Sequence, residues 1–212
     1  MIRIAIIIGS TRPGRRGEVV ARWVVDVAGR QPAVKAGDAT VEVVDLADHG
    51  LPLLDEPVPA MFGAYRHSHT KRWAATIDSF DGFVFVTPEY NHSLPAALKN
   101  AIDFLYAEWN DKAAGFVSYG VHGGTRAVEH LRQVLAEVKV AGVRTPVVLP
   151  VFTEFDFTGF DDNDPTAPGV FSPGEHQAAS LATMLDEVIT WARALKPLRT
   201  TTARAGLEAL SA

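Results

Sequence analysis

Residues 2–17 read IRIAIIIGSTRPGRRG, an aliphatic run that ends in a loop rich in glycine and arginine. The apolar run is too short for a helix and too unbroken for a half-exposed strand, so it predicts a strand buried on both faces. A buried strand that leads through a glycine-bearing loop into a helix is typical of α/β proteins with a parallel sheet. This stretch therefore predicts the fold class of the whole chain.

The same alternation of short apolar strands and segments of helical period recurs along the sequence. The third strand, near residues 82–87, carries a second unbroken apolar run, FVFV. Alternating strands and helices form a mostly parallel sheet covered on both faces, so we expect a doubly wound fold. The expected strands are 2–8, 41–46, 82–87, 113–118 and 144–149, and the expected helices are 18–30, 65–80, 94–105, 125–138 and 173–195.

The composition is that of an ordinary globular protein. The chain has 212 residues, of which 47% are hydrophobic and 21% charged, and no stretch approaches the roughly 18 consecutive apolar residues of a membrane span. We expect one domain over residues 1–197, a C-terminal tail over 198–212 and no membrane partner. The chain enters its first strand without a leader-like segment, which predicts a cytoplasmic protein.

Charge and cysteine content exclude several kinds of function. The net charge of −5 argues against a nucleic-acid binder, which would carry a clustered basic surface. The chain has no cysteine, so disulfides, thiol catalysis and thiolate-held iron–sulfur or zinc sites are excluded. Any redox chemistry must therefore use a bound cofactor.

The loop after the first strand departs from the two commonest phosphate-binding patterns. Gly9 and Gly14 have the spacing of a nucleoside-triphosphate loop, but Arg15 and Arg16 replace its lysine and magnesium-binding hydroxyl. The G-x-G-x-x-G pattern of dinucleotide sites fails because Ser10 follows Gly9 and no glycine stands at position 11. Neither ligand class suits this loop.

A terminal monophosphate suits the loop better. A helix that begins near Gly17 directs free N–H groups and the positive end of its dipole at the loop. The Ser10 hydroxyl and the guanidinium groups of Arg12, Arg15 and Arg16 are able to bind phosphate oxygens. In the alternative interpretation the arginines are solvated surface residues and the glycines only turn the chain.

Two further loops follow the third and fourth strands. Pro88 and Pro95 restrict the backbone on either side of EYNHSL, so we expect a rigid loop whose N–H groups are free. Residues 118–124, SYGVHGG, offer small residues for close approach to a ligand and Tyr119 to cover it. Ligands of doubly wound sheets bind beyond the carboxyl ends of the strands, where these loops meet. Together they predict a site for a flat ring system with a phosphate tail, which is the shape of FMN.

Three motifs, in this order, resemble those of the NADPH-dependent FMN reductase family of flavodoxin-like proteins. They are GSTRPGRRG at 9–17, PEYNHSLPAALKNAIDF at 88–104 and SYGVHGGTRAVEHLRQ at 118–133. The resemblance covers about residues 1–150 and implies a three-layer α/β sandwich with a five-stranded parallel sheet of order 2-1-3-4-5. It also implies bound FMN, NADPH as hydride donor and a small-molecule acceptor such as a flavin, quinone, azo compound or metal oxyanion.

The resemblance assigns cofactor-binding roles motif by motif. The first motif holds the FMN phosphate through Ser10, Arg12, Arg15, Arg16 and Gly17. The second lines the isoalloxazine ring with Pro88, Glu89, Tyr90 and Asn91, and the third completes the ring pocket with Ser118, Tyr119, Gly120, Gly123 and Gly124.

The expected chemistry belongs to the cofactor, and the protein supplies orientation and electrostatics. Hydride transfer needs no side-chain acid or base, so we name no catalytic residue, and His67 and His69 lack the partners of a metal site. Two other functions fit the same motifs. One is a flavodoxin-type electron carrier without nicotinamide turnover, and the other is a binding module that has lost its cofactor.

Three expectations concern regions outside the loops. Helix 94–105 contributes to a dimer interface in the family that the chain resembles, so we expect a homodimer or a homotetramer. Residues 152–173 are acidic, aromatic and longer than an ordinary connection, which indicates a lid, a partner contact or a solvated excursion. The tryptophans at 23, 73, 109 and 191 are expected to pack in the core or against a second subunit.

Overall fold

The computed structural model describes residues 1–161, 164 and 167–210, with side chains through residue 199. Its centre is a parallel sheet in the order β2-β1-β3-β4-β5, which confirms the predicted topology. The strands of this path are β1 (Ile2–Ile8), β2 (Ala39–Asp45), β3 (Gly82–Pro88), β4 (Lys112–Gly120) and β5 (Val140–Gly142).

Two short strands share the position where one fifth strand was expected at 144–149. Both β5 and β6 (Val147–Pro150) pair in parallel with β4. Pro146 lies between them and has no N–H to donate, and the Thr145 N–H donates to the Glu187 carboxylate rather than to the sheet. The Val143 N–H still donates to the Ala114 carbonyl of β4, so the ladder is interrupted by residues 144–146 and resumes at Val147.

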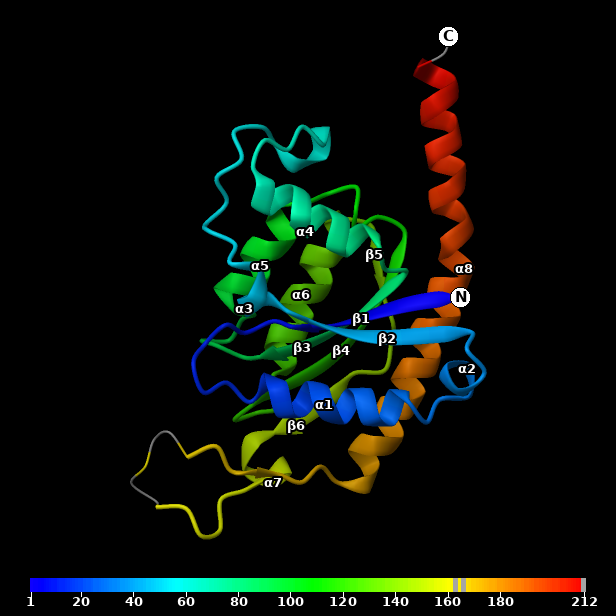
Figure 1. The fold of residues 1–212 in the computed structure, drawn as a ribbon. Coiled ribbons are helices and arrows are strands. Elements are labelled where there is room, and N and C mark those ends of the chain that lie inside the picture. Colours follow the sequence, from blue (N-terminus) through cyan, green and yellow to red (C-terminus); the bar gives the residue numbers. More distant parts are fainter. Residues whose placement is uncertain (162–163, 165–166, 211–212) are drawn as a thin grey trace.

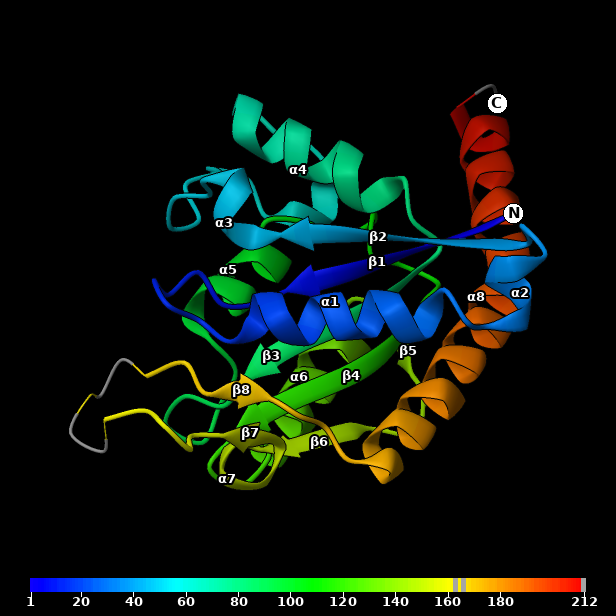
Figure 2. The ribbon, with the colours of Figure 1, turned by 60° about the horizontal axis from the view of Figure 1, so that its bottom comes forward.

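Helices cover both faces of the sheet and give three layers (Figures 1 and 2). One face packs against α1 and α8, and the other against α4, α5 and α6. The long helices are α1 (Gly17–Ala28), α4 (Ser68–Asp78), α5 (Ala96–Asp103), α6 (Thr125–Glu137) and α8 (Glu175–Leu210). The shorter ones are α2 (Pro32–Lys35), α3 (Leu46–His49), η1 (Ala60–Phe62) and α7 (Val151–Glu154).

Alternation along β1 explains why both faces are apolar. Ile4 and Ile6 point into the core under α1 and α8, while Ala5 and Ile7 point into the core under α4 and α5. Burial on both faces requires an unbroken apolar run, which is the pattern that the sequence shows. The second core also holds Trp73 and Trp109, both fully buried, as expected.

The last helix is longer than the sequence pattern predicts. Helix α8 continues past residue 195 to Leu210, and its C-terminal half projects beyond the sheet (Figure 1). Asp81 fixes its middle to the body by accepting hydrogen bonds from Lys196 and Arg199. The helix crosses the expected boundary at 197/198, and the division into a domain and a tail stays a prediction; residues 211–212 lie outside the described part. No described helix is long and apolar enough to span a membrane.

The segment 152–173 contains secondary structure that the sequence did not predict. Strands β7 (Phe155–Asp156) and β8 (Val170–Phe171) pair antiparallel and form a second, two-stranded sheet. An aromatic contact holds this sheet to the body, because the Phe171 ring lies 5.5 Å from the ring of Trp23 on α1. The segment thus lies beside the carboxyl edge of the main sheet, next to the first predicted loop.

Candidate functional site

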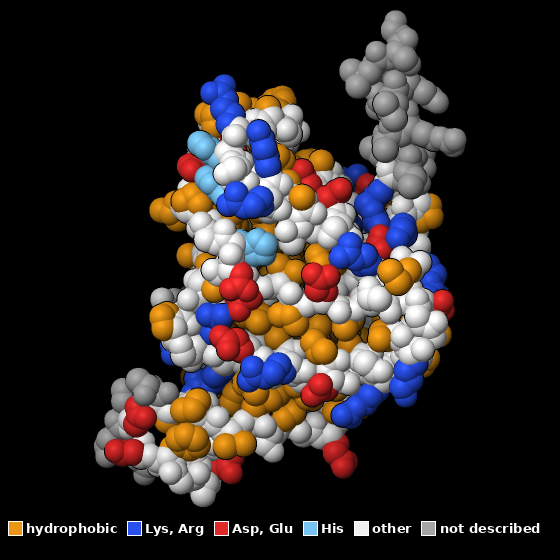
Figure 3. Space-filling model, in the orientation of Figure 1, with side chains coloured by type: hydrophobic (Ala, Val, Ile, Leu, Met, Phe, Trp, Pro, Cys, Tyr) orange, Lys and Arg blue, Asp and Glu red, His pale blue; other side chains and the backbone are white. Residues whose placement is uncertain are grey.

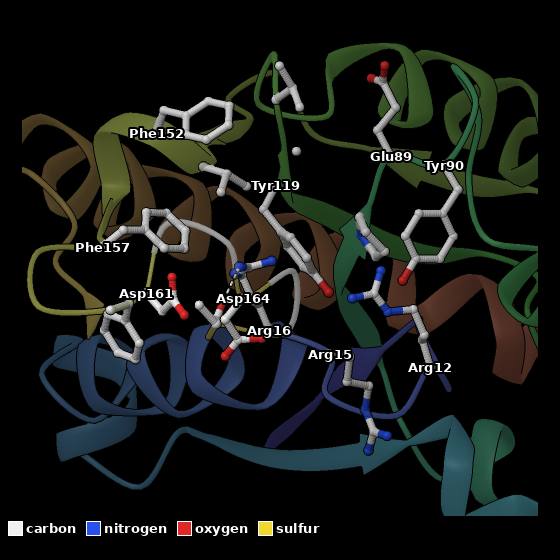
Figure 4. A pocket seen from close by; sticks show the side chains of 16 residues that line it. Arg12, Arg15, Arg16, Glu89, Tyr90, Tyr119, Phe152, Phe157, Asp161 and Asp164 are labelled. Carbon is white, nitrogen blue, oxygen red and sulfur yellow. Dashed lines mark hydrogen bonds between the residues drawn. The ribbon is translucent and has the colours of Figure 1, made fainter. Parts of the chain in front are cut away.

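A cavity of about 670 Å³ opens at the carboxyl edge of the sheet, where the loops after β1, β3 and β4 meet (Figure 4). This is the edge at which ligands of doubly wound folds bind. The lining includes eight of the fourteen predicted site residues: Arg12, Arg15, Arg16, Pro88, Glu89, Tyr90, Tyr119 and Gly120. The other lining residues are Val121, Val151, Phe152, Phe157, Phe160, Asp161, Asp164 and Ala167.

The polar end of the cavity is the start of α1. The N-cap residue, Arg16, makes no side-chain hydrogen bond to the first turn, so the first N–H groups and the helix dipole are directed at the loop. A Cβ on Gly17 would lie 2.9 Å from Ile8 Cγ2, so only glycine lets the helix begin this close to β1. Arg12 is exposed and reaches into the cavity beside Tyr90 (Figure 4). These groups form a cradle for an anion.

Arg15 serves a different purpose from Arg12. Its guanidinium lies 2.5 Å from Asp45, at the end of β2, and 3.0 Å from Glu18. In Figure 4 the side chain is directed away from Tyr90 and Arg12. Although Arg15 borders the cavity, its charge is neutralised by two carboxylates, which leaves it a weaker candidate for phosphate binding than Arg12.

Arg16 is held by the segment 152–173. Its Nε and Nη2 donate to the carbonyl oxygens of Pro168 and Ala167, at 3.0 and 2.9 Å. The guanidinium also lies over the rings of Phe155 and Phe157, at 5.5 and 5.4 Å from their centroids. Burial lowers the pKa of Arg16, but a guanidinium stays charged at any ordinary pH. Arg16 thus ties the segment to the start of α1.

Hydrogen bonds within the protein hold the second predicted loop, whose N–H groups were expected to be free. Its N–H groups are not all free, because Glu89 donates to the Tyr119 carbonyl, and Tyr90 and Ser93 exchange hydrogen bonds across a tight turn. Asn91 sits at the exposed tip of this turn in the left-handed region, with φ 49°, and does not line the cavity. The Tyr90 hydroxyl bonds to Ser10 at 2.9 Å and joins the first and second loops.

Glu89 fixes the spacing between the second and third loops. Its carboxylate accepts hydrogen bonds from the Arg126 N–H and from the Arg126 guanidinium, at 3.1 and 2.8 Å. Burial alone raises the pKa of Glu89, but the hydrogen bonds and the charge of Arg126 outweigh it and hold the pKa below its ordinary value. The carboxylate thus binds at the start of α6, and its role is to position the two loops.

The small residues of the third loop are needed for packing within the protein. A Cβ on Gly124 would lie 2.8 Å from Ser118 Cβ and 3.0 Å from the Tyr119 backbone, and one on Gly123 would lie 2.2 Å from Val148 Cγ1. The Ser118 hydroxyl donates to the Gly123 carbonyl at 2.7 Å. These three residues are buried behind the cavity, where they shape the loop whose Gly120 lines it.

Tyr119 points away from the place that the sequence predicted. We expected it over a flat ring, but the side chain packs beneath α1, and its hydroxyl would lie 3.2 Å from a Cβ on Gly17. Strand alternation explains this direction, since Val117 and Tyr119 face the same core as α1.

The segment 152–173 supplies the lining that sequence reasoning missed. Phe152, Phe157 and Phe160 border the cavity together with the carboxylate residues Asp161 and Asp164 (Figure 4). The density of aromatic residues was visible in the sequence, but nothing in it indicated that β7 and β8 would fold the segment back over α1. The segment therefore forms part of the site.

The residues present fit a mononucleotide flavin. The cavity lies within the range of volumes usual for cofactor sites. The start of α1 and Arg12 provide for a phosphate, and Pro88, Tyr90 and Gly120 line the same cavity and provide for the rings. The Tyr119 hydroxyl, buried at the phosphate end, has no hydrogen-bond partner among the described residues. Fold and site together define a flavodoxin-like protein with a site for a phosphate-bearing aromatic cofactor.

Comparisons with known proteins agree with this class. Residues 2–154 match the NADPH-dependent FMN reductase family, and the chain belongs to that family. It is accordingly an oxidoreductase that uses FMN and NAD(P)H.

Individual relatives support the assignment. The chain is 42% identical over 168 residues to an NAD(P)H-dependent FMN reductase of Nectria sp, covering 76% of this chain and 82% of the relative. It is 36% identical over 140 residues to a quinone reductase of Escherichia coli, covering 63% and 69%. Among solved structures, the flavoenzyme NAD(P)H:(acceptor) oxidoreductase of Paracoccus denitrificans has a TM-score of 0.64 at 22% identity, covering 92% of this chain and 99% of that one, which shows the shared fold.

Proposed function

We propose that this protein takes hydride from NAD(P)H and delivers it to quinone-type acceptors through FMN bound in the cavity described above. The cavity carries this proposal, because it combines an anion cradle with aromatic side chains. When bound, FMN would supply the redox chemistry, which is hydride transfer between the nicotinamide and the acceptor. A quinone is the acceptor named for one relative, the quinone reductase of Escherichia coli.

The side chains of this chain bind and orient rather than transfer protons. Arg12 and the start of α1 provide for the phosphate, and the Glu89–Arg126 ion pair holds the two ring-facing loops at a fixed separation. Phe152 and Phe157, with ring centroids 6.3 Å apart, offer an apolar surface against which a planar acceptor binds. Such a surface favours flat, uncharged rings, because they lose little hydration on binding.

An assay of NAD(P)H oxidation tests this function. Purified protein supplied with FMN is expected to oxidise NADPH or NADH when a benzoquinone is added, and to bleach the FMN absorbance when no acceptor is present. Protein that binds FMN but does not oxidise either nicotinamide is an electron carrier, and the proposal is then wrong. Protein that binds no FMN is a module without its cofactor, which also refutes the proposal.

The acceptor surface has its own matched test. Replacing Phe152, which is 73% exposed, by alanine is expected to raise KM for the quinone several-fold and leave the FMN dissociation constant unchanged. Val170→Ala is the control, because Val170 is exposed on the same segment but does not line the cavity. Equal KM values in the two variants contradict the assigned surface.

The proposed oligomer is a homodimer or a homotetramer, located in the cytoplasm. Apolar side chains of the segment before α4 support self-association, since Leu53, Met61 and Phe62 are 83%, 65% and 68% exposed. This segment, residues 50–67, runs along the upper left side of Figure 3 to its top. Asn100 of α5 accepts a hydrogen bond from the Leu54 N–H and donates one to the Pro52 carbonyl. Sedimentation at low micromolar concentration is expected to show a dimer or larger species, and a monomeric mass refutes the assembly.

A further inference from the structure

Two buried side-chain atoms of the site, the Tyr119 hydroxyl and the Arg15 Nε, have no hydrogen-bond partner among the described residues. Tyr119 is 5% exposed, and its hydroxyl makes no hydrogen bond to any described residue. Buried hydroxyl groups are nearly always hydrogen-bonded, so an orphan of this kind requires a physical explanation. The hydroxyl lies beside Gly17, where α1 presents its first N–H groups.

The neighbouring polar groups bond elsewhere. The Tyr90 hydroxyl pairs with Ser10, and Arg16 donates to backbone carbonyls of the segment 152–173. Arg15 pairs with carboxylates through its Nη2, although its Nε has no partner among the described residues. The charges of all three loop arginines nevertheless act on Tyr119. The position next to the hydroxyl is therefore positive in potential, which suits an anion.

The hydroxyl is suited to donate rather than to carry charge. Burial raises the pKa of Tyr119, and Tyr90 raises it further, against the smaller opposing effect of the arginines. The group stays protonated at physiological pH. A neutral O–H beside a helix start donates to a phosphate oxygen without adding like charge.

We propose that the Tyr119 hydroxyl donates a hydrogen bond to the terminal phosphate of FMN and thereby selects FMN over riboflavin. This inference rests on the proposed function, and it makes Tyr119 part of the phosphate site rather than of the ring pocket. The hydroxyl is buried, and Tyr119 lines the cavity together with Arg12, Arg15 and Arg16. The proposal therefore requires that a side chain of the first loop shift when phosphate binds. Arg12 is the residue able to shift, because it is exposed, whereas Arg15 and Arg16 are held by hydrogen bonds to Asp45 and to backbone carbonyls.

The test is Tyr119→Phe, which removes only the hydroxyl. Loss of one hydrogen bond to a charged group is expected to raise the FMN dissociation constant by roughly 10-fold or more. Riboflavin lacks the phosphate, so its dissociation constant is expected to change by less than about twofold. Both constants are measured by quenching of flavin fluorescence on binding to the apoprotein.

Thermal unfolding of the apoprotein gives a second, independent readout. Because the hydroxyl has no partner without cofactor, Tyr119→Phe is expected to leave the apo Tm unchanged or raise it. Tyr65→Phe is the matched control, since the Tyr65 hydroxyl donates to Glu108 at 2.8 Å, remote from the cavity lining. This control is expected to lower the apo Tm and leave FMN binding unaffected.

The possible outcomes separate this inference from the proposed function. Equal FMN binding by wild type and Tyr119→Phe refutes the inference alone, as does an equal loss of FMN and riboflavin, which indicates a ring contact. A lower apo Tm for Tyr119→Phe also refutes it, because the hydroxyl then has a partner within the protein. Wild-type protein that binds neither flavin refutes the proposed function and the inference with it.

Discussion

Arg12 and Arg15 carry the same charge in the same loop, and the structure predicts opposite consequences when each is replaced by alanine. Arg12 reaches into the cavity, whereas the Arg15 guanidinium binds Asp45 and Glu18. Arg12→Ala is expected to weaken FMN binding and leave the fold intact. Arg15→Ala is expected to destabilise the fold and change FMN affinity much less.

The magnitudes follow from the partners. Loss of one charge-assisted hydrogen bond to phosphate corresponds to about 1.5–3 kcal/mol, or roughly 10- to 100-fold in the FMN dissociation constant. Breaking a well-buried ion pair costs about 3–5 kcal/mol. The side chains of the Arg15–Asp45 pair are not fully buried, with 12% and 14% exposure. After the loss of Arg15, the Asp45 carboxylate would still accept a hydrogen bond from the Ala47 N–H. We therefore expect about 2 kcal/mol, or a decrease in Tm of about 4–8 °C.

Two measurements on each variant check this difference. Fluorescence titration gives the FMN dissociation constant, and thermal unfolding of the apoprotein gives Tm. Arg22→Ala, an exposed position on α1, is the control for loss of one positive charge and is expected to change neither quantity. The reasoning is wrong if Arg15→Ala weakens FMN binding as strongly as Arg12→Ala while its apo Tm stays at the wild-type value.

Three further predictions concern the loops and the sheet. Glu89→Gln weakens the bond to Arg126 and is expected to lower the free energy of unfolding by about 1 kcal/mol at pH 7. Because the pKa of Glu89 is lowered in the folded protein, this loss is present above the ordinary glutamate pKa and disappears as the pH falls through the pKa of the folded state. A difference in Tm that persists in acid contradicts this prediction. Gly124→Ala is expected to lower the free energy of unfolding by about 3 kcal/mol in urea, because φ is +81° and the new Cβ would meet backbone atoms. Gly37→Ala is the control, with a similar φ of +76° but open space around the new Cβ, and is expected to lower it by about 1 kcal/mol. Equal losses would falsify the packing argument. Burial lowers the pKa of Lys112 to about 8, so between pH 8 and 10.5 the unfolded chain keeps this proton and the folded chain does not. As the pH rises through this range, the free energy of unfolding of wild type is expected to increase by up to about 3 kcal/mol relative to Lys112→Met. A constant difference between the two proteins in urea unfolding refutes the lowered pKa.

Much of the fold was predictable because it depends on local patterns. Strands buried on both faces must be continuously apolar, and the runs in β1 and β3 are. Alternation with helices then limits the topology to a parallel, doubly wound sheet. The interruption between β5 and β6 was not predicted, because it depends on the bond between Thr145 and Glu187, two residues far apart in the sequence.

The sequence by itself determined which loops meet at the site, since parallel strands bring their carboxyl ends to one edge. It also determined the residue types there, including the arginines and glycines of the first loop. Only the tertiary structure decided what each side chain does. Arg15 binds Asp45 from the neighbouring strand, Arg16 binds the segment 152–173, and Tyr119 lies beneath α1 instead of over a ring. The physical reason is that packing between elements far apart in the sequence sets the surroundings of each side chain, and no local sequence pattern encodes that packing.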